Sequence, residues 1–315
     1  MGVEMVERAR VGKAPKRGTA YQREYSLCAV VFLLPMIFFL VVFVVWPILS
    51  SAQMSLFAWN GVSPTRQYVG FQNWSRLIGD RIFWSAFRNN LTVLVLSIVI
   101  QIPMGMALAV LVSNGGRWMV VFKTVCFLPM LMSSVAIGIL FKYVYDPYFG
   151  VLTASLKAVG LSPLVRNWLG DPQIALYSVI AVVCWQFIPF YMILFEAGIA
   201  GIPVELHEAA IIDGATENQY FWHITLPLLW GTTRAAVSLA LFGSLTYFDL
   251  VWVMTTGGPS GATELMATYM VKKAFLSTEV GYGSTVAFAM FLIVVLISGI
   301  AFFVTRRKES SPWSS

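Results

Sequence analysis

Long apolar runs alternate with shorter polar stretches along the whole chain. A helix needs about 20 consecutive, predominantly apolar residues to cross a lipid bilayer. Five runs of about this length contain no Asp, Glu, Lys or Arg, and a sixth run, 230–254, carries Arg234 near one end and Asp249 near the other. The five uncharged runs are 27–49, 91–112, 124–141, 174–195 and 282–305. The pattern therefore predicts an all-α, polytopic membrane protein with six transmembrane helices.

Composition agrees with this interpretation. Of the 315 residues, 58% are hydrophobic and 11% are charged, and the mean hydropathy is +0.76. A soluble domain cannot bury so much apolar surface. The run 27–49 follows basic residues, as the core of a signal peptide would, but it is longer than a signal core of about 7 to 15 apolar residues. We therefore expect it to be retained as a membrane anchor.

Basic residues near both ends of the chain predict its orientation. Six spans place the two termini on the same side of the membrane, and the side rich in Lys and Arg faces the cytoplasm. We expect a basic cytoplasmic tail at residues 1–26, a membrane domain at 27–305 and a second cytoplasmic tail at 306–315. The net charge of +6 comes mostly from these tails, where cations meet anionic lipid headgroups. It does not indicate nucleic-acid binding.

The polar segment 198–228 lies between two spans and is expected to face the cytoplasm, where a soluble partner could meet it. Pro203 suits the first position of a helix, because its missing N–H would be unpaired there in any case. Glu205 then falls in the first turn, where its charge favours the helix dipole. This helix should stop near Gly214, since glycine readily adopts the left-handed conformation that ends helices.

A second short helix should follow at once. Thr216, with Gln219 three residues later, has the spacing of a capping box, and the run should end before Pro227. The segment contains no Lys or Arg but several carboxylates, so it suits a partly basic docking groove; a solvated acidic face is the alternative for Glu205 and Glu217. The carboxylates are Glu205, Glu208, Asp213 and Glu217.

Ten positions in this segment resemble the EAA motif of permease subunits in ATP-driven importers that rely on a substrate-binding protein. Ten matches at fixed spacing make the resemblance specific, whereas a bare Glu-Ala-Ala would be an ordinary helical fragment. The alternative is a cytoplasmic connector whose glycine merely permits a turn. The matched residues are Glu208, Ala209, Ala210, Asp213, Gly214, Ala215, Phe221, Ile224, Leu226 and Pro227.

Three further polar stretches resemble the outer loops of the same family, so the resemblance covers about residues 27–305. It is closest to the first permease of carbohydrate importers, the class that includes maltose, raffinose and glycerol-3-phosphate systems. The stretches include Val69-Gly70-Phe71-Gln72-Asn73-Trp74, Trp168-Leu169-Gly170-Asp171-Pro172 and Thr256-Gly257-Gly258-Pro259.

The resemblance implies the six-helix fold of type I ABC importer permeases, in the cytoplasmic membrane of a bacterium. Besides the lipid bilayer, the implied partners are a second homologous permease, two copies of a cytoplasmic ATP-binding subunit, an extracytoplasmic sugar-binding protein, and a sugar or oligosaccharide as the substrate. Closure of the ATPase would move the short helix at Glu208, and the pathway would open alternately to each side. The chain lacks a Gly-x-x-x-x-Gly-Lys-[Ser/Thr] loop for ATP phosphates. It is therefore expected to be a transport subunit rather than an enzyme, with no cofactor of its own.

The competing function is an ion-coupled secondary transporter or a channel, which generally keeps ionisable groups inside the membrane. Each candidate group lies near the end of a span, where its side chain could snorkel to the interface: Lys142, Glu196, Arg234 and Asp249. His207 and His223 lack the spacing of a metal site and are expected to be exposed or hydrogen-bonded surface groups. Three cysteines lie in apolar spans without ligand-like spacing, so metal sites and disulfides are not indicated.

Four polar or aromatic residues within the apolar runs are candidates for the substrate pathway. Trp185 and Gln186 lie in the fourth span, and Tyr247 and Asp249 lie in the fifth. An unpaired polar group in hydrocarbon costs several kcal/mol, and sugars are typically held by aromatic faces together with amides or carboxylates. The resemblance also implies that these middle spans line the substrate cavity. The alternative for each residue is hydrogen bonding or packing between helices.

Overall fold

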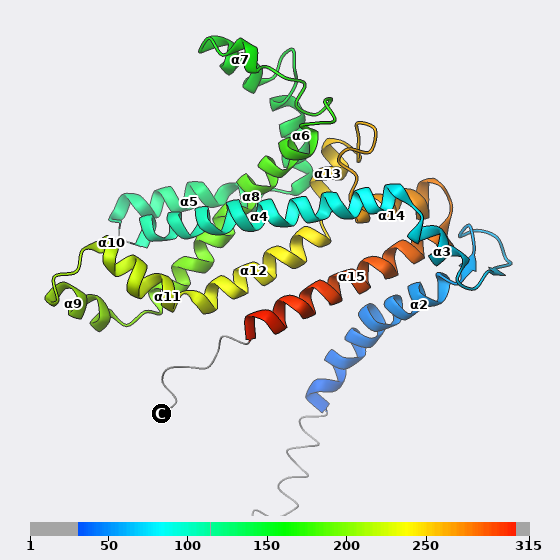
Figure 1. Ribbon diagram of the computed structural model, residues 1–315, viewed down its shortest axis with the longest axis horizontal. Helices are drawn as coiled ribbons and strands as arrows, with labels where there is room; N and C mark the ends of the chain where they lie inside the picture. The colour runs from blue at the N-terminus through cyan, green and yellow to red at the C-terminus, as the bar shows by residue number, and fades with distance from the viewer. Residues whose placement is uncertain (1–30, 114, 307–315) are drawn as a thin grey trace, which may run out of the picture. The chain divides into compact units, whose positions relative to one another are not determined.

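A computed structural model describes residues 31–113 and 115–306 of the chain (Figure 1). The chain divides into two compact units, Met1–Gln53 and Met54–Ser315. We describe each unit by itself.

The described residues are mostly helical and contain almost no strand, which confirms the all-α prediction. Within them the only strands are β1 (Phe57–Ala58) and β2 (Gln67–Tyr68), which pair antiparallel. The tails predicted at 1–26 and 306–315 lie outside the described residues, except that the last helix ends at Arg306.

The described part of the first unit, residues 31–53, is one apolar helix, whose last residue, Met54, is the first residue of the second unit. The helix contains a wide π turn, η1 (Val41–Val45), followed by α2 (Trp46–Met54). The whole stretch Val31–Met54 is 24 residues long and apolar enough to cross a membrane. It corresponds to the run predicted at 27–49.

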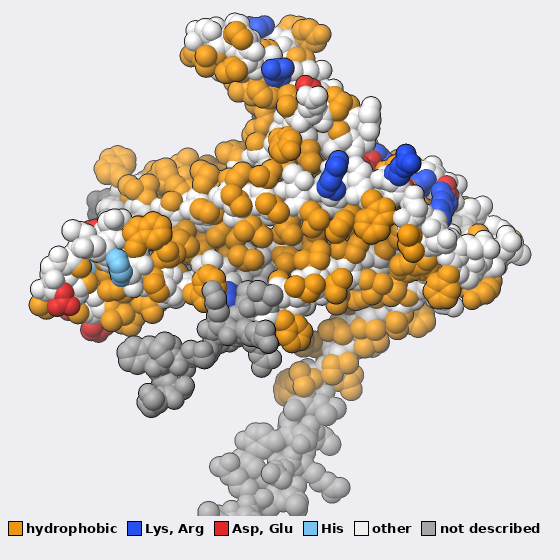
Figure 2. Space-filling view, in the orientation of Figure 1, with side chains coloured by type: hydrophobic (Ala, Val, Ile, Leu, Met, Phe, Trp, Pro, Cys, Tyr) orange, Lys and Arg blue, Asp and Glu red, His pale blue; other side chains and the backbone are white. Residues whose placement is uncertain are grey.

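The second unit is built on long apolar helices. Helix α4 packs along α8 and α12, and α12 also packs against α15. Three clusters of buried apolar side chains lie between these helices. Apolar side chains also cover the middle of the face shown in Figure 2, as expected for a surface in contact with lipid. The helices are α4 (Arg81–Ser113), α8 (Ala175–Ala200), α12 (Trp230–Leu245), α13 (Asp249–Met254) and α15 (Val280–Arg306).

Shorter elements gather at the two ends of the second unit (Figure 1). One end, beside the last turns of α4 and α8, carries α9 (Val204–Ile212), α10 (Glu217–Tyr220), η3 (Phe221–Thr225) and α11 (Leu226–Leu228). The opposite end carries the two strands, α3 (Gln72–Ile78) and the first turns of α4 and α15. The remaining short elements are α7 (Val151–Ala158), η2 (Ser162–Leu164), α14 (Met266–Val271) and η4 (Lys272–Leu276).

The third predicted span is not one straight helix. It is divided between α5 (Arg117–Leu131) and α6 (Ser134–Val144), and the two helices meet at a bend of 97°. Ser133 has an extended ψ of 135°, and its hydroxyl accepts a hydrogen bond from the Val135 N–H at 3.3 Å, so α6 begins with its own N-cap. The described residues therefore contain five helices long and apolar enough to cross a membrane, or six if the bent pair is one span.

Asn90 fixes the break between α12 and α13. Its side-chain N–H donates to the backbone carbonyl oxygens of Ser244 at 2.9 Å and Leu245 at 3.3 Å, which end α12. Its carbonyl oxygen accepts from the Met266 N–H at 2.9 Å, at the start of α14. Asn90 is fully buried, with 0% of its surface exposed. A single amide therefore pairs backbone groups that the interrupted helices leave without intrahelical partners.

Candidate functional site

The first short helix of the polar segment forms close to where the sequence predicts it. Helix α9 begins at Val204, and Pro203 is its N-cap with an extended ψ of 131°. The prediction that Pro203 is the first helical residue is therefore wrong by one position. The Pro203 carbonyl oxygen accepts from the Leu206 N–H at 3.2 Å, and Glu205 lies in the first turn, as predicted. An acidic side chain is favourable there because the N-terminal end of the helix dipole is positive.

Gly214 ends this helix, as predicted. Its φ is +76°, a value that glycine adopts at little cost. The Gly214 N–H donates to the Ile211 carbonyl oxygen at 3.0 Å, and the Ala215 N–H donates to the Ala210 carbonyl oxygen at 2.9 Å. These two bonds form a Schellman motif. The motif reverses the chain direction within two residues and leads directly into α10.

The capping box at the start of α10 is also confirmed. The Gln219 N–H donates to the Thr216 hydroxyl at 3.3 Å, and the Thr216 N–H donates to the Gln219 side-chain oxygen at 2.8 Å. The helical run does not end before Pro227, however, which corrects that prediction. A wide π turn, η3, precedes the proline, and regular bonding continues beyond it, with the Leu229 N–H donating to Thr225 at 3.0 Å. Pro227 therefore removes one donor without ending the run.

The ten EAA-like positions divide between an exposed face and a packed face. Ala210 is only 6% exposed. Four of the positions are partly buried: Ala215, Phe221, Ile224 and Leu226. Five are exposed to solvent: Glu208, Ala209, Asp213, Gly214 and Pro227. The motif thus both packs the segment together and forms an accessible surface.

Apolar side chains on α9 are exposed as well, and the sequence prediction, which stressed the carboxylates, missed them. Val204, Ile211 and Ile212 all face solvent, and Ile212 is 84% exposed. Their spacing of seven and eight residues, which places side chains on one helical face, was the available signal. The exposed surface of α9 is therefore apolar with acidic groups beside it.

Contacts between side chains hold α9 against α10. The His207 Nε2 lies 3.3 Å from the Glu217 carboxylate, and the His207 ring meets the Tyr220 ring edge-on, with centroids 4.8 Å apart. His207 is thus a hydrogen-bonded surface group, as predicted. A cavity of about 460 Å³ lies behind this contact, between α9, α10 and the last turns of α4 and α8. Its lining includes Val110, Ser113, Ile199, His207, Glu217 and Phe221.

An ion pair joins α5 to α8 near the same end of the unit. The Lys123 Nζ lies 2.6 Å from the Glu196 carboxylate, and the two side chains are partly buried. Glu196 was a candidate for snorkelling to the interface, but the structure pairs it with a cation. A paired carboxylate needs no coupling ion to explain its presence at the edge of the membrane.

A second cavity, of about 210 Å³, lies between α4, α8 and α12 and contains one of the four pathway candidates. Tyr247 lines it, and within the described part of the chain the buried Tyr247 hydroxyl has no hydrogen-bond partner. Gln101 and Ser97, which the sequence analysis did not single out, line the same cavity and are hydrogen-bonded to each other at 3.2 Å. Gln101 could have been noticed as a polar residue inside an apolar run.

The other three pathway candidates lie outside this cavity. Gln186 is only 3% exposed, and its side-chain N–H donates to the Ser134 hydroxyl at 3.4 Å, between α8 and α6. Trp185 packs edge-on against Phe141, with ring centroids 5.2 Å apart. Asp249 is exposed in the first turn of α13. The structure therefore brings Tyr247 together with Gln101, rather than with the other candidates.

Comparisons with known proteins place these features in context. Residues 101–310 match the family described as "Binding-protein-dependent transport system inner membrane component". The chain is 38% identical to the probable ABC transporter permease protein YurN of Bacillus subtilis, over 88% of this chain and 96% of that protein. It is 30% identical to the lactose transport system permease protein LacF of Rhizobium radiobacter, over 92% and 98% respectively. The same fold occurs in a chain of the bacterial alginate ABC transporter, which was solved in complex with its alginate pentasaccharide-bound periplasmic protein. The TM-score is 0.81 and the sequence identity is 23%, over 93% of this chain and 98% of that chain.

Proposed function

Because this chain belongs to the family of binding-protein-dependent transport system inner membrane components, we propose that it forms, with a second permease, the membrane pathway of an ATP-driven sugar importer. The main support is the arrangement of α9, Gly214 and α10. Helix α9 is accessible to solvent, its end is fixed by the Schellman hydrogen bonds at Gly214, and it lies beside the last turns of α4 and α8. Such an element can transmit a movement from a soluble partner to the membrane.

The exposed face of α9 is suited to docking a cytoplasmic ATP-binding subunit. Val204, Ile211 and Ile212 supply apolar contact area, and burial of such area is the usual source of affinity at the core of an interface. Glu208 and Asp213, both exposed beside them, add charges that would favour a partly basic groove. The ten EAA-like positions would thus act as the coupling residues, five of them at the surface and five in the packing behind it.

Movement of α9 would reach the membrane through the elements packed behind it. The His207–Glu217 contact and the Schellman motif make α9 and α10 move together, and the run from η3 to α11 leads into α12. Helix α12 lines the cavity that contains Tyr247. Closure of two ATP-binding subunits would therefore change the packing around that cavity and open the pathway to alternate sides.

The cavity between α4, α8 and α12 has the chemistry of a pathway for hydroxylated substrates. The Tyr247 hydroxyl has no hydrogen-bond partner among the described residues, and Gln101 and Ser97 offer further hydrogen-bonding groups beside the rings of Phe187 and Phe190. Trp185 and Asp249 are exposed and would reach the pathway where this chain faces the second permease, whereas Gln186 is buried and bonded to Ser134. The sugar class is supported by a relative whose name specifies lactose and by the alginate transporter with the same fold.

This function implies the orientation of the chain. The α9 end would lie in the cytoplasm with both termini, and the α3 end would lie outside the cytoplasmic membrane, where a sugar-binding protein delivers substrate. The excess of Lys and Arg in the two tails supports this orientation.

Purification and reconstitution test the proposal directly. The chain, expressed with its native genomic neighbours and purified in mild detergent, should bring with it a second permease and two copies of an ATP-binding subunit. In proteoliposomes the complex should take up sugar only with ATP and the binding protein. Uptake that follows a proton or sodium gradient without ATP would instead establish the ion-coupled alternative.

A further inference from the structure

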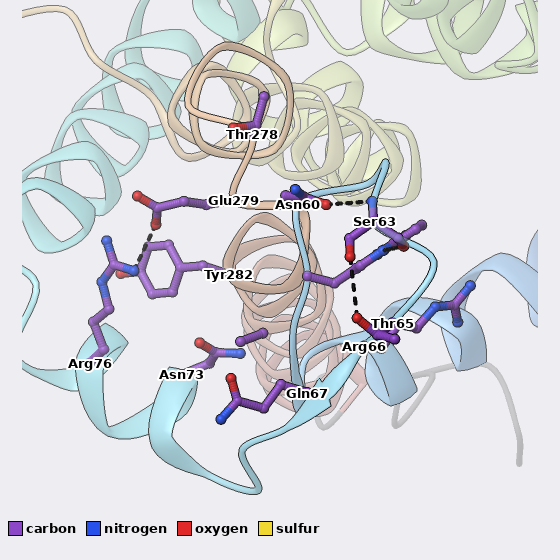
Figure 3. Close-up of a pocket in the computed structure, with 12 residues that line it drawn as sticks. Asn60, Ser63, Thr65, Arg66, Gln67, Asn73, Arg76, Thr278, Glu279 and Tyr282 are labelled. Carbon is purple, nitrogen blue, oxygen red and sulfur yellow. Dashed lines mark hydrogen bonds and ion pairs between the residues drawn. The ribbon is translucent and has the colours of Figure 1, made fainter.

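A polar cavity of about 500 Å³ opens at the α3 end of the second unit (Figure 3). Three segments surround it: the stretch 58–67, helix α3, and the turn that leads into α15. It shares no lining residue with the cavity that contains Tyr247. Its lining consists of Ala58, Trp59, Asn60, Ser63, Thr65, Arg66, Gln67, Asn73, Arg76, Thr278, Glu279 and Tyr282.

Two side-chain amides at this cavity retain hydrogen-bonding capacity. Among the described residues, the exposed Gln67 amide has no side-chain partner. The Asn73 amide N–H groups donate to the backbone carbonyl oxygens of Ser55 at 2.9 Å and Phe57 at 3.1 Å. These bonds fix the orientation of the amide and leave its oxygen as an acceptor. Sugar hydroxyls are both donors and acceptors, so groups of both kinds are needed to bind them.

The rim of the cavity is held in place by its own contacts. The Asn60 side-chain oxygen accepts from the Val62 and Ser63 N–H groups, at 3.1 and 2.8 Å. The Trp59 indole N–H donates to the Ser63 carbonyl oxygen at 2.8 Å, and the Arg66 guanidinium lies 4.4 Å from the centre of the Trp59 ring. A preorganised rim lowers the entropy lost when a ligand binds.

The cavity is lined by two arginines, Arg66 and Arg76, and one glutamate, Glu279. Arg76 is already paired with Glu279 at 2.7 Å (Figure 3), and its guanidinium lies 4.0 Å from the centre of the Tyr282 ring. An acidic group would have to compete with Glu279 for Arg76, but not for Arg66, which has no carboxylate partner among the described residues. The Arg76–Glu279 pair can donate hydrogen bonds to neighbouring sugar hydroxyls and accept hydrogen bonds from them while the two side chains stay paired.

The floor of the cavity is braced by a second cluster. The Asp80 carboxylate accepts hydrogen bonds from the Tyr282 hydroxyl at 2.5 Å and from the Tyr269 hydroxyl. Asp80 precedes α4, Tyr269 lies in α14, and Tyr282 lies in the first turn of α15. The cluster therefore fixes α15 relative to α4, and it includes Tyr282, which lines the cavity.

We propose that this cavity is a second saccharide-binding site, which takes a di- or trisaccharide outside the membrane span. The proposal rests on the proposed function, which supplies a sugar at this end of the chain. The volume lies within the range of about 300 to 1,000 Å³ that is usual for small-molecule sites. The lining is mostly polar, and the guanidinium groups of Arg66 and Arg76 lie over its two aromatic rings, Trp59 and Tyr282. The site would hold sugar close to the entrance of the pathway.

A fluorescent reporter at the rim tests this proposal. Thr65, which lines the cavity, is replaced by cysteine and labelled with an environment-sensitive dye, in a chain whose three native cysteines are replaced by alanine. The labelled importer complex, in lipid nanodiscs, is titrated separately with lactose, maltose, cellobiose and raffinose. At least one sugar should give a saturable change in fluorescence.

Matched variants identify the site that responds. Gln67→Ala should raise the Kd by about fivefold, the contribution of one hydrogen bond. Gln72→Ala, an exposed residue of the same type that does not line the cavity, should leave the Kd unchanged. Equal Kd values for the parent and Gln67→Ala would overturn the proposal.

Other outcomes separate this proposal from the proposed function. If none of the four sugars changes the fluorescence while the same preparation still takes up sugar with ATP, the second site does not exist but the importer function stands. If sugar-free binding protein changes the fluorescence and the sugars do not, the cavity is a protein-docking surface, and the proposal is likewise wrong.

Discussion

Gly214 offers a direct test of how the short helix is coupled to transport. Its φ is +76°, and a Cβ added there would meet no atom within 4 Å. A substitution therefore acts through the backbone conformation alone, without a steric clash against neighbouring side chains. The effect should follow how well each residue tolerates positive φ.

The expected magnitude follows from that backbone strain. A non-glycine residue in the left-handed region costs about 1–2 kcal/mol, asparagine tolerates it better, and a β-branched residue tolerates it least. A change of about 1–2 kcal/mol lowers the population of the capped α9–α10 turn roughly 5- to 30-fold. Coupling should therefore weaken in the order Gly214→Asn, Gly214→Ala, Gly214→Val.

The measurement is the stimulation of ATP hydrolysis by sugar-loaded binding protein, together with sugar uptake by proteoliposomes. Gly160→Val is a matched control, because Gly160 has a φ of +77° and equally open surroundings but lies beyond α7, outside the α9–α10 segment. It should preserve coupling. Equal coupling in all three Gly214 variants, or equal loss in Gly160→Val, would refute the reasoning.

Four further predictions concern other parts of the chain. Cysteines at the exposed positions Ala209 and Thr216 should crosslink to an ATP-binding subunit, as identified by mass spectrometry of the products. A cysteine at the exposed Phe71, which directly precedes α3 at the opposite end of the second unit, should not. Tyr247→Phe should leave the Tm unchanged, because the hydroxyl has no partner among the described residues, but should slow sugar uptake about fivefold. Unchanged sugar uptake would show that Tyr247 does not line the pathway. Lys123→Met should destabilise the protein by about 1–2 kcal/mol, because Glu196 loses its partner at 2.6 Å; this is the cost of breaking a buried ion pair, reduced because both side chains are partly exposed. Adding Glu196→Gln should restore most of the Tm, and failure to do so would contradict an electrostatic role. Burial raises the pKa of Asp80, but hydrogen bonds from Tyr269 and Tyr282 outweigh burial and hold the pKa below its ordinary value. The ionised carboxylate therefore stabilises the fold above about pH 4, and this stabilisation is lost as the pH falls through the lower folded-state pKa. The difference in Tm between the parent and Asp80→Asn should disappear only in that acidic range.

Local sequence signals predicted the conformation of the segment 203–219 well. The end of α9 at Gly214 and the capping box of Thr216 and Gln219 depend on residues within a few positions of one another, so the chain specifies them locally. The apolar spans were equally accessible, because hydrocarbon requires long uninterrupted runs. Function in the membrane and the helical class followed from these two signals.

Features that depend on distant parts of the chain could not be predicted. Hydropathy gives no sign of the 97° bend between α5 and α6, which lies inside an apolar run, although Ser133, the N-cap of α6, was a local signal. Tyr247 meets Gln101 only because α12 packs along α4, and Gln186 meets Ser134 only because α6 starts at the bend. Polar residues in spans identified candidates for the site, but their partners came from packing between helices.

The Asn90 amide has a consequence for biosynthesis. Its partners Ser244, Leu245 and Met266 lie 154, 155 and 176 residues further along the chain. At a synthesis rate of about 5 to 20 residues per second, roughly 8 to 35 seconds separate the emergence of Asn90 from that of these partners. During this interval α4 must wait at the membrane with its amide unsatisfied or bound to water. The newly made protein therefore passes through a stage in which α4 is inserted but not locked, and only synthesis of the start of α14 ends it.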